Sequence, residues 1–413
     1  MISPRRFAMP AAGLALLAWT AVPASASVFA PASVPPGGGF YHLADGGRCL
    51  DVELRDRPCR GRTAQLRLEA APGGQVILVD GANRRSAPTT LDHAGDGRYR
   101  VGGSLRTFEP LGGARRWTDI ADGFAEGTTG GAAGATVTVT TQEELAAYVT
   151  AAEPYVIKVA ATIELTPKGT ELKVASDKTI IGAGTAGEIV GGGFFLGPDT
   201  SNVIIRNLTI RDTLMPEDDP DDKSFDYDAI QIDSAHHVWI DHNRLTRMND
   251  GLLDSRKDAT AITVSWNQFL DNNKTFGIGW TPNVTARMTI HHNWFARTGQ
   301  RNPSADNLAN LHMYSNYLQD VGAYGNYVRG GTKGVIEHSL FHNVPDPYYV
   351  SPIGELVQRD NIVSGSSFWH EGLIKEQGAA FEPTDFYAYA PDPATALPGL
   401  LATSAGPQES IGR

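Results

Sequence analysis

The sequence lacks the features that mark several other protein classes. After residue 26 it contains no apolar run of about 18 residues, the length that a membrane-spanning helix needs. It also lacks the basic stripe that is typical of nucleic-acid-binding proteins, and its formal net charge is −11. Its two cysteines are too few for a structural zinc site made of thiolates. We therefore expect no membrane and no nucleic acid among its partners.

The composition that remains is that of a packed protein. Hydrophobic residues make up 41% of the 413 residues and charged residues 20%, which excludes a mostly disordered chain. Nothing in the sequence indicates a symmetric interface, so we expect a monomer. If the ligand of such an acidic protein is itself acidic, local lysines and arginines or a bound cation must bridge the two.

The first 26 residues have the pattern of a signal peptide. Arg5 and Arg6 form a basic start, a mostly apolar run follows over 7–22, and the small residues ASA at 24–26 match a cleavage site. This pattern predicts a secreted, extracellular protein. The arginine pair leaves open whether export uses the general or the twin-arginine route.

Three further zones follow the signal peptide. Residues 27–38 are rich in proline and glycine and are expected to form a linker. Residues 39–115 are expected to form a small β-rich appendage of unknown role, in which Cys49 and Cys59 form a local disulfide. The letters GRCLDV at 47–52 resemble the start of a ricin-type lectin repeat, but a β-trefoil needs three such repeats and we find one. Residues 116–413 form the long remaining zone.

The long zone contains a repeat. Five short runs rich in Val, Ile, Thr and Trp each end at an asparagine, and these asparagines are 36, 24, 26 and 23 residues apart: Asn207, Asn243, Asn267, Asn293 and Asn316. A period of this length indicates a solenoid, and the residue types indicate strands. Asparagine tolerates left-handed backbone geometry, and its amide can bond the asparagine of the next coil. The alternative is a set of coincidental loop asparagines.

These observations predict an all-β protein, a right-handed parallel β-helix. A helix is expected over 141–149, because Thr141 can serve as its N-cap and Glu144 follows three residues later. Such a helix would cap the N-terminal end of the solenoid, which otherwise exposes unpaired strand edges.

Two pairs of acids are separated by one period of the repeat. Asp226 and Asp228 would share one face of a strand, and Asp250 and Asp254 flank Gly251, which permits a turn. The pairs should therefore lie on neighbouring coils, on the same side. Because four converging carboxylates repel one another, a hard cation with oxygen ligands is expected among them, and Ca²⁺ fits best. The alternative is a solvated acidic loop of the kind found at 218–222.

Two cationic side chains continue this column. Lys274 lies 24 residues after Asp250, and Arg301 lies 27 residues after Lys274. Single lysines and arginines are usually solvated, but this spacing places both on the face that carries the acids.

At these residues the sequence resembles the pectate lyases of the first polysaccharide lyase family. The resemblance covers about residues 117–405, and the fold that it implies is the right-handed parallel β-helix of the family. The matching stretches are TGG at 129–131, SDKTIIGAG at 176–184, NVIIRNL at 202–208, VWIDHN at 238–243, DGLLD at 250–254, KT at 274–275, HHN at 291–293 and RNP at 301–303.

The resemblance implies a metal site. Asp228, Asp250 and Asp254 match the calcium-binding acids of the family, and Asp226 matches a further acid.

The resemblance also implies the roles of the cations. Lys274 matches the lysine that grips a galacturonate carboxylate, and Arg301 matches the arginine proposed as the base. The family often has a second arginine five places after the first, whereas this chain has Asp306 there. That departure removes a cation from the substrate cleft.

The expected activity is calcium-assisted β-elimination on de-esterified pectin (polygalacturonate), which gives 4,5-unsaturated oligogalacturonates. Because arginine loses its proton only at strongly alkaline pH, an arginine base predicts an alkaline optimum. Three alternatives remain open: a pectin lyase that acts on methyl-esterified substrate without calcium, a glycoside hydrolase with two carboxylates across the bond, and a polysaccharide-binding solenoid without activity.

Overall fold

The computed structural model describes residues 41–59, 62–71, 75–80, 84–95, 98–110, 117–216 and 225–413. The predicted signal peptide at 1–26, the predicted linker at 27–38 and the acidic run at 218–222 lie outside these ranges. Within them, no helix combines the length and the apolar character that crossing a bilayer requires.

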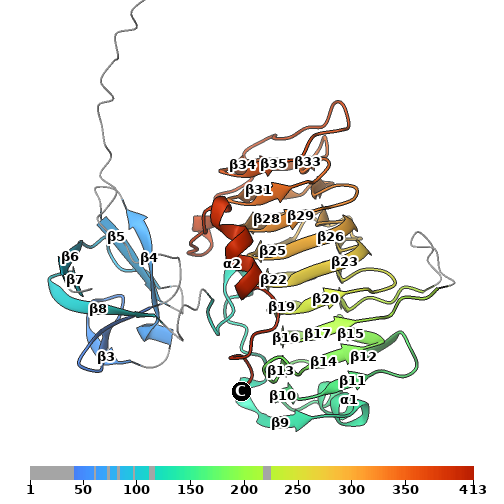
Figure 1. Ribbon diagram of the computed structural model, residues 1–413, viewed down its shortest axis with the longest axis horizontal. Helices are drawn as coiled ribbons and strands as arrows, with labels where there is room; N and C mark the ends of the chain where they lie inside the picture. The colour runs from blue at the N-terminus through green and yellow to red at the C-terminus, as the bar shows by residue number, and fades with distance from the viewer. Residues whose placement is uncertain are drawn as a thin grey trace, which may run out of the picture.

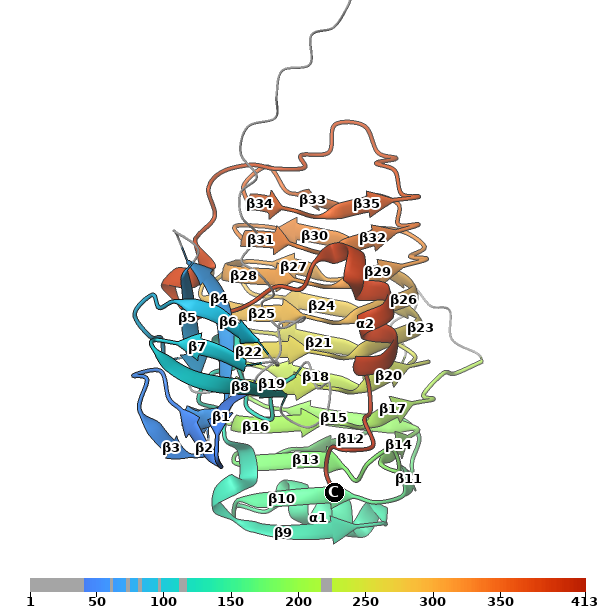
Figure 2. The same ribbon diagram turned by 60° about the vertical axis from the view of Figure 1, so that its left-hand side comes forward.

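The described residues from 41 to 110 form an eight-stranded antiparallel sheet with its own small core. Figures 1 and 2 show it beside the long solenoid. Leu43, Leu66 and Leu78 are fully buried in this core, and Cys49 and Cys59 form the predicted disulfide. The strands are β1 (Tyr41–Asp45), β2 (Arg48–Leu50), β3 (Asp56–Pro58), β4 (Leu66–Ala71), β5 (Gln75–Asp80), β6 (Leu91–Gly95), β7 (Arg98–Val101) and β8 (Ser104–Pro110).

The chain from 117 onward forms the predicted parallel β-helix (Figure 1). From β10 to β33, each turn gives one strand to each of three parallel sheets, so that strands three apart in the chain are hydrogen-bonded neighbours; at the N-terminal end, β9 pairs with β10. The first solenoid sheet contains β9 (Ala135–Val139), β10 (Tyr155–Val159), β13 (Lys178–Gly182), β16 (Ser201–Arg206), β19 (His236–Asp241), β22 (Thr260–Ser265), β25 (Ala286–His291), β28 (Leu308–Tyr314), β31 (Lys333–Glu337) and β34 (Glu355–Arg359).

The other two solenoid sheets complete each turn (Figure 2). The second sheet contains β11 (Thr162–Glu164), β14 (Glu188–Val190), β17 (Thr209–Arg211), β20 (Arg244–Thr246), β23 (Gln268–Lys274), β26 (Trp294–Gln300), β29 (Tyr317–Gln319), β32 (Leu340–His342) and β35 (Ile362–Ser364). The third sheet contains β12 (Thr170–Lys173), β15 (Gly192–Leu196), β18 (Ile230–Asp233), β21 (Leu253–Arg256), β24 (Phe276–Gly279), β27 (Ser304–Asp306), β30 (Asn326–Arg329) and β33 (Tyr348–Val350).

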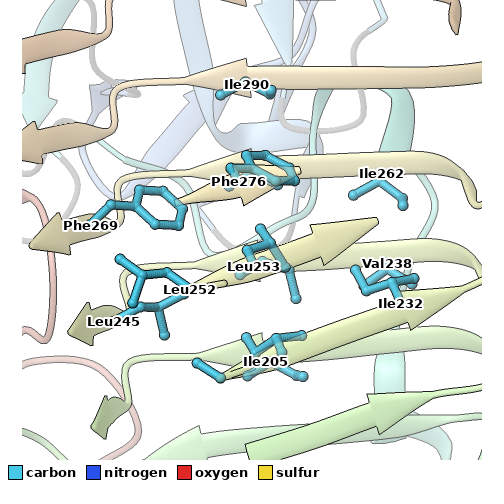
Figure 3. Packing of buried hydrophobic residues seen from close by; sticks show 14 of the residues in the cluster. Ile205, Ile232, Val238, Leu245, Leu252, Leu253, Ile262, Phe269, Phe276 and Ile290 are labelled. Carbon is cyan, nitrogen blue, oxygen red and sulfur yellow. The ribbon is translucent and has the colours of Figure 1, made fainter. Parts of the chain in front are cut away.

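The core lies inside the coil, where side chains from all three sheets meet (Figure 3). Parallel register places similar residues above one another, so that Val203 of β16 pairs with Val238 of β19, which pairs with Ile262 of β22. The rings of Phe269 and Phe295 stack on adjacent turns with centroids 4.7 Å apart. Apolar columns of this kind hold every rung in one register, because a shift by one residue would turn them out of the core.

The predicted asparagine ladder runs through four of the five asparagines. The Nδ2 atoms of Asn243, Asn267 and Asn293 each donate to Oδ1 of the asparagine on the next turn, at 3.0–3.1 Å, and the last acceptor is Asn316. The same oxygens accept backbone N–H groups, at 2.8–3.0 Å. Each side chain is therefore held by both main chain and neighbour.

The prediction was wrong for Asn207, which does not join the ladder amide to amide. Arg206 pairs with Asp241, so Asn207 stands opposite His242 and one place before the ladder position. The left-handed residue of the turn is the one before the ladder asparagine, and both Asn207 and His242 have that geometry, with φ of 62° and 54°. The ladder instead ends on the N–H of Leu208, which donates to Asn243.

Two helices lie against the solenoid. Helix α1 (Gln142–Thr150) contacts β10 and β12, and its N-cap is Thr141, whose hydroxyl accepts the N–H of Glu144. Helix α2 (Leu397–Ser404) lies along the side of the stack (Figure 1) and buries Leu397 and Leu401 in one cluster with Trp266. The C-terminal tail thus packs on the solenoid.

Candidate functional site

An acidic cluster lies where the third sheet begins on two neighbouring turns. Asp226, Asp228 and Asp250 each offer a carboxylate oxygen, and these three oxygens all lie within 4.8 Å of one another. Asp226 and Asp228 precede β18, whereas the sequence placed them on a strand. The one-period spacing brings the acids together as predicted, because the N–H of Ala229 bonds the carbonyl of Gly251 on the next turn.

Asp228 is the buried centre of this cluster. Its Oδ1 accepts the N–H of Gly251 at 2.6 Å, while its Oδ2 is buried without a hydrogen-bond partner. A methyl group on Gly251 would lie 2.8 Å from Asp228 Oδ1 and 3.0 Å from Asp254 Oδ1. A glycine is therefore required at position 251, because no larger side chain fits between the two carboxylates. The sequence alone predicts only that Gly251 permits a turn.

Asp254 borders the cluster from β21. It is 1% exposed, and its Oδ1 accepts the N–H of Gly277 at 3.1 Å. Burial raises the pKa of Asp254 to about 7, although the nearby Arg301 favours the charged form. It lines one cavity together with Asp226 and Asp250, but the set of three mutually close carboxylates does not include it.

Burial and mutual repulsion disfavour charge on the cluster. Burial raises the pKa of Asp228 well above its ordinary value, and the carboxylates of Asp254, Asp226 and Asp250 raise it further. Burial and a hydrogen bond with Asp250 raise the pKa of Asp226. An all-oxygen donor set with an unpartnered buried oxygen fits a hard divalent cation such as Ca²⁺, which relieves both penalties.

The two predicted cations lie on the next turns of the same face. Lys274 ends β23, and its Nζ lies 2.5 Å from Asp250 Oδ1. Asn272 fixes this geometry, because its Nδ2 donates to the carbonyls of both Asp250 and Lys274. Arg301 sits in the bend between β26 and β27, in left-handed geometry, and its carbonyl accepts the N–H of Phe276.

One cavity of about 220 Å³ collects these groups. It is lined by Asp226, Asp250, Asp254, Arg256, Lys274, Trp280 and Arg301. Of the six residues singled out from the sequence, only Asp228 is absent from this lining; it is buried, and a carboxylate oxygen of it lies within 4.8 Å of oxygens of Asp226 and Asp250. The solenoid thus brings all six together.

Sequence reasoning missed Arg256 and gave Trp280 only a minor place. Arg256 donates from Nε to Asp233 at 2.9 Å, and its Nη1 lies 3.7 Å from Asp226. Trp280 is 52% exposed, and the guanidinium groups of Arg256 and Arg301 lie 5.9 and 5.5 Å from its ring centroid. The available signal was strand alternation, since Arg256 follows Asp254 by two residues on β21 and shares its face.

The fold and the site together define a β-helix protein whose cleft holds an acidic cluster beside several cations. A family model described as pectate lyase matches residues 114–397 of this chain. The chain therefore belongs to the pectate lyase family, and its enzyme class is that of a pectate lyase.

Individual relatives agree with this assignment. A pectate trisaccharide-lyase of Thermotoga sp. strain RQ2 is 36% identical over 314 residues, which cover 68% of this chain and 85% of the relative. The enzyme of the same name from Thermotoga maritima is 42% identical over 199 residues, which cover 46% of this chain and 53% of the relative. Among solved structures, a pectate lyase from Bacillus sp. N165 in complex with trigalacturonate is 27% identical, with a TM-score of 0.58, and the match covers 70% of this chain and 98% of that one.

Proposed function

We propose that this protein cleaves polygalacturonate by β-elimination, with a divalent cation held at the acidic cluster. The observation that carries the proposal is the single cavity in which acids from two turns meet Lys274 and Arg301 from the next two. An anionic polymer needs such cations, because the protein as a whole is acidic. The relatives named as pectate trisaccharide-lyases support the same substrate.

Each proposed step uses groups that line the cavity. Arg301 takes the proton from C5, next to the sugar carboxylate, and the electron pair forms the double bond between C4 and C5. The bond from C4 to the glycosidic oxygen breaks, and that oxygen leaves with a proton from solvent. Lys274 binds the carboxylate on which negative charge develops, and stabilising charge where it develops is usually the largest catalytic contribution.

The acids would hold the cation. Asp226, Asp228 and Asp250 supply three converging oxygens, and Asp254 closes the same cavity. When bound, Ca²⁺ supplies positive charge that polarises the substrate carboxylate and acidifies the proton on C5. Lys274 neutralises Asp250 in the structure, so it is already placed beside the charge that the substrate would bring.

The decisive experiment is a spectrophotometric assay on polygalacturonate. Elimination creates an unsaturated product that absorbs in the ultraviolet, whereas hydrolysis and simple binding create none. We expect the absorbance to rise with calcium, to stop with chelator and to be fastest at alkaline pH. Activity only on methyl-esterified pectin and without calcium would favour a pectin lyase, and reducing ends without absorbance would favour a hydrolase. The product lengths test whether this chain releases trisaccharides.

We also propose that the protein is secreted, that its first helix caps the solenoid and that it is a monomer. The disulfide between Cys49 and Cys59 supports secretion, because disulfides persist in oxidising compartments. Helix α1 is proposed to cap the first turn of the solenoid, which it contacts at β10 and β12. The boundaries at 26, 38 and 115 and the monomeric state stay proposals, for which mass spectrometry of the exported protein and light scattering are the tests.

A further inference from the structure

A second cavity of about 230 Å³ continues the site along the solenoid. It shares Trp280 and Arg301 with the first cavity, and its other walls are Gly277, Ile278, Ser304, Asp306 and Arg329. The strands that supply these walls, β24, β27 and β30, are successive neighbours in the third sheet. The lining of the two cavities therefore extends three turns beyond the acidic cluster, as an extended polymer requires.

Arg329 brings an uncompensated charge to this second cavity. It is exposed at the end of β30, and its guanidinium carbon lies 5.4 Å from the ring centroid of Tyr327. In the part of the chain that the structure describes, its side chain makes no hydrogen bond and no ion pair within 4.0 Å. Arg256 differs, because its guanidinium is tied to Asp233.

Asp306 sets the balance of charge around Arg329. The two residues are directly paired in register on β27 and β30, yet their side chains form no ion pair. Arg301, Arg329 and Asp306 together leave one net positive charge in the cavity. The wall thus attracts a single carboxylate and offers it a planar, two-pronged donor, which matches the geometry of that group.

We propose that Arg329 binds the carboxylate of a second uronate residue of the polymer, one sugar or more away from the residue that reacts. This inference rests on the proposed function and extends it to specificity. A methyl ester at that sugar would remove the charge that Arg329 recognises, so Arg329 would select unesterified stretches. Asp306 would weaken this grip, because a like charge beside the sugar carboxylate opposes binding.

The test compares Arg329→Ala with Arg287→Ala. Arg287 is a matched control, because it is exposed on β25, lies 5.2 Å from the ring centroid of Phe386 and lines neither cavity. On polygalacturonate with calcium, we expect Arg329→Ala to raise KM about tenfold with kcat within about twofold, the pattern of lost ground-state binding. Arg329→Lys should recover part of the loss, and Asp306→Asn should lower KM. Arg287→Ala should match the wild type.

Two further measurements separate this inference from the proposed function. The rise in KM should shrink on pectins of increasing methyl esterification. Retardation of the protein in a gel that contains polygalacturonate reports binding without turnover, and Arg329→Ala should be retarded less than Arg287→Ala. A wild type without lyase activity whose retardation still depends on Arg329 would refute only the proposed function. Equal KM and equal retardation in the two variants, or a loss confined to kcat, would overturn the role of Arg329.

Discussion

Two columns of polar side chains run along the same solenoid. The side chains of one column satisfy one another's hydrogen bonds, whereas those of the other column do not. In the asparagine ladder, the amides of Asn243, Asn267 and Asn293 each donate to the next turn and accept from the turn before, and all three are fully buried. In the acidic column, Asp228 is equally buried but keeps an oxygen without a partner. An amide is both donor and acceptor, whereas a carboxylate only accepts.

The difference explains why one column is structural and the other is a site. Stacked amides satisfy one another, so that the ladder needs nothing from outside the chain. Stacked carboxylates repel and leave buried lone pairs, which costs free energy until a cation or a proton arrives. Replacing neutral amides by acids at neighbouring rungs thus turns a stabilising feature into a binding one.

The largest effect should come from removing the cations of the site. Arg301→Ala and Lys274→Ala should each lower kcat by two or more orders of magnitude, because a proton acceptor and a charge stabiliser contribute about that much. Circular dichroism should stay unchanged, since neither side chain belongs to the core. Arg297→Ala is the control, because Arg297 is a surface residue of β26 paired with Asp271. Near-normal turnover in either site variant would remove that residue from the mechanism.

Breaking the ladder should cost stability and leave the calcium response intact. In Asn267→Ala, the N–H of Asn243 loses its acceptor, and the carbonyl of Ile240 and Oδ1 of Asn293 each lose one donor. We expect the free energy of unfolding to fall by about 3 kcal/mol, because each buried unsatisfied group costs about 1–3 kcal/mol. Denaturant unfolding measures this, with the exposed Asn283→Ala as control. A loss below that of the control would show that the ladder amides are replaceable.

Removing the central acid should have the opposite signature. In Asp228→Asn, unfolding in chelator should need no less free energy than in the wild type, because a buried unneutralised charge is gone. Calcium at 100 times its dissociation constant should stabilise the wild type by about 2.7 kcal/mol and the variant by far less. Thermal unfolding with and without calcium measures both, with Asp320→Asn as an exposed control. An unchanged calcium shift would mean that the cation binds elsewhere.

The smallest effect concerns Asp254, whose pKa of about 7 exceeds the value of about 3.9 in an unfolded chain. The folded protein then binds the extra proton, so its stability in chelator should fall as pH rises from about 4 to about 7. Asp254→Asn should lose this fall and should need several times more calcium for half-maximal activity. Melting temperatures across pH and a calcium titration test the two parts. Parallel pH curves for variant and wild type would contradict the assignment.

The period of the repeat predicted most of the fold and most of the site. The regular spacing of the asparagines predicted parallel coils, and one period between Asp226 and Asp250 predicted their meeting. Register was harder, because Asn207 ends a run like the others yet pairs one place off, with His242. A coil that is one residue longer or shorter still contains the same types of residue. The resulting shift in register is therefore visible only in the backbone pairing.

The neighbours of the site escaped prediction for a second reason. The cavity walls also include Arg256, Trp280 and Arg329, which do not stand one period from the acids. Contacts of this kind have no fixed interval in the sequence. Arg329 in particular lies 28 residues after Arg301, in a run that matches no motif. Only the closed turn shows that these side chains face one cleft.

The division of the cleft among successive turns has a consequence for how this protein can change. Each turn contributes one to three functional groups, and the interval between neighbouring turns is the strand spacing of about 4.8 Å that backbone pairing imposes. A whole extra coil inserted between β27 and β30 would keep Arg301 beside the acids and move Arg329 one turn further from them. The number of turns that line the cleft thus sets the length of polymer that the protein can bind. Duplication of one coil in the gene would change that length and leave the existing loops as they are.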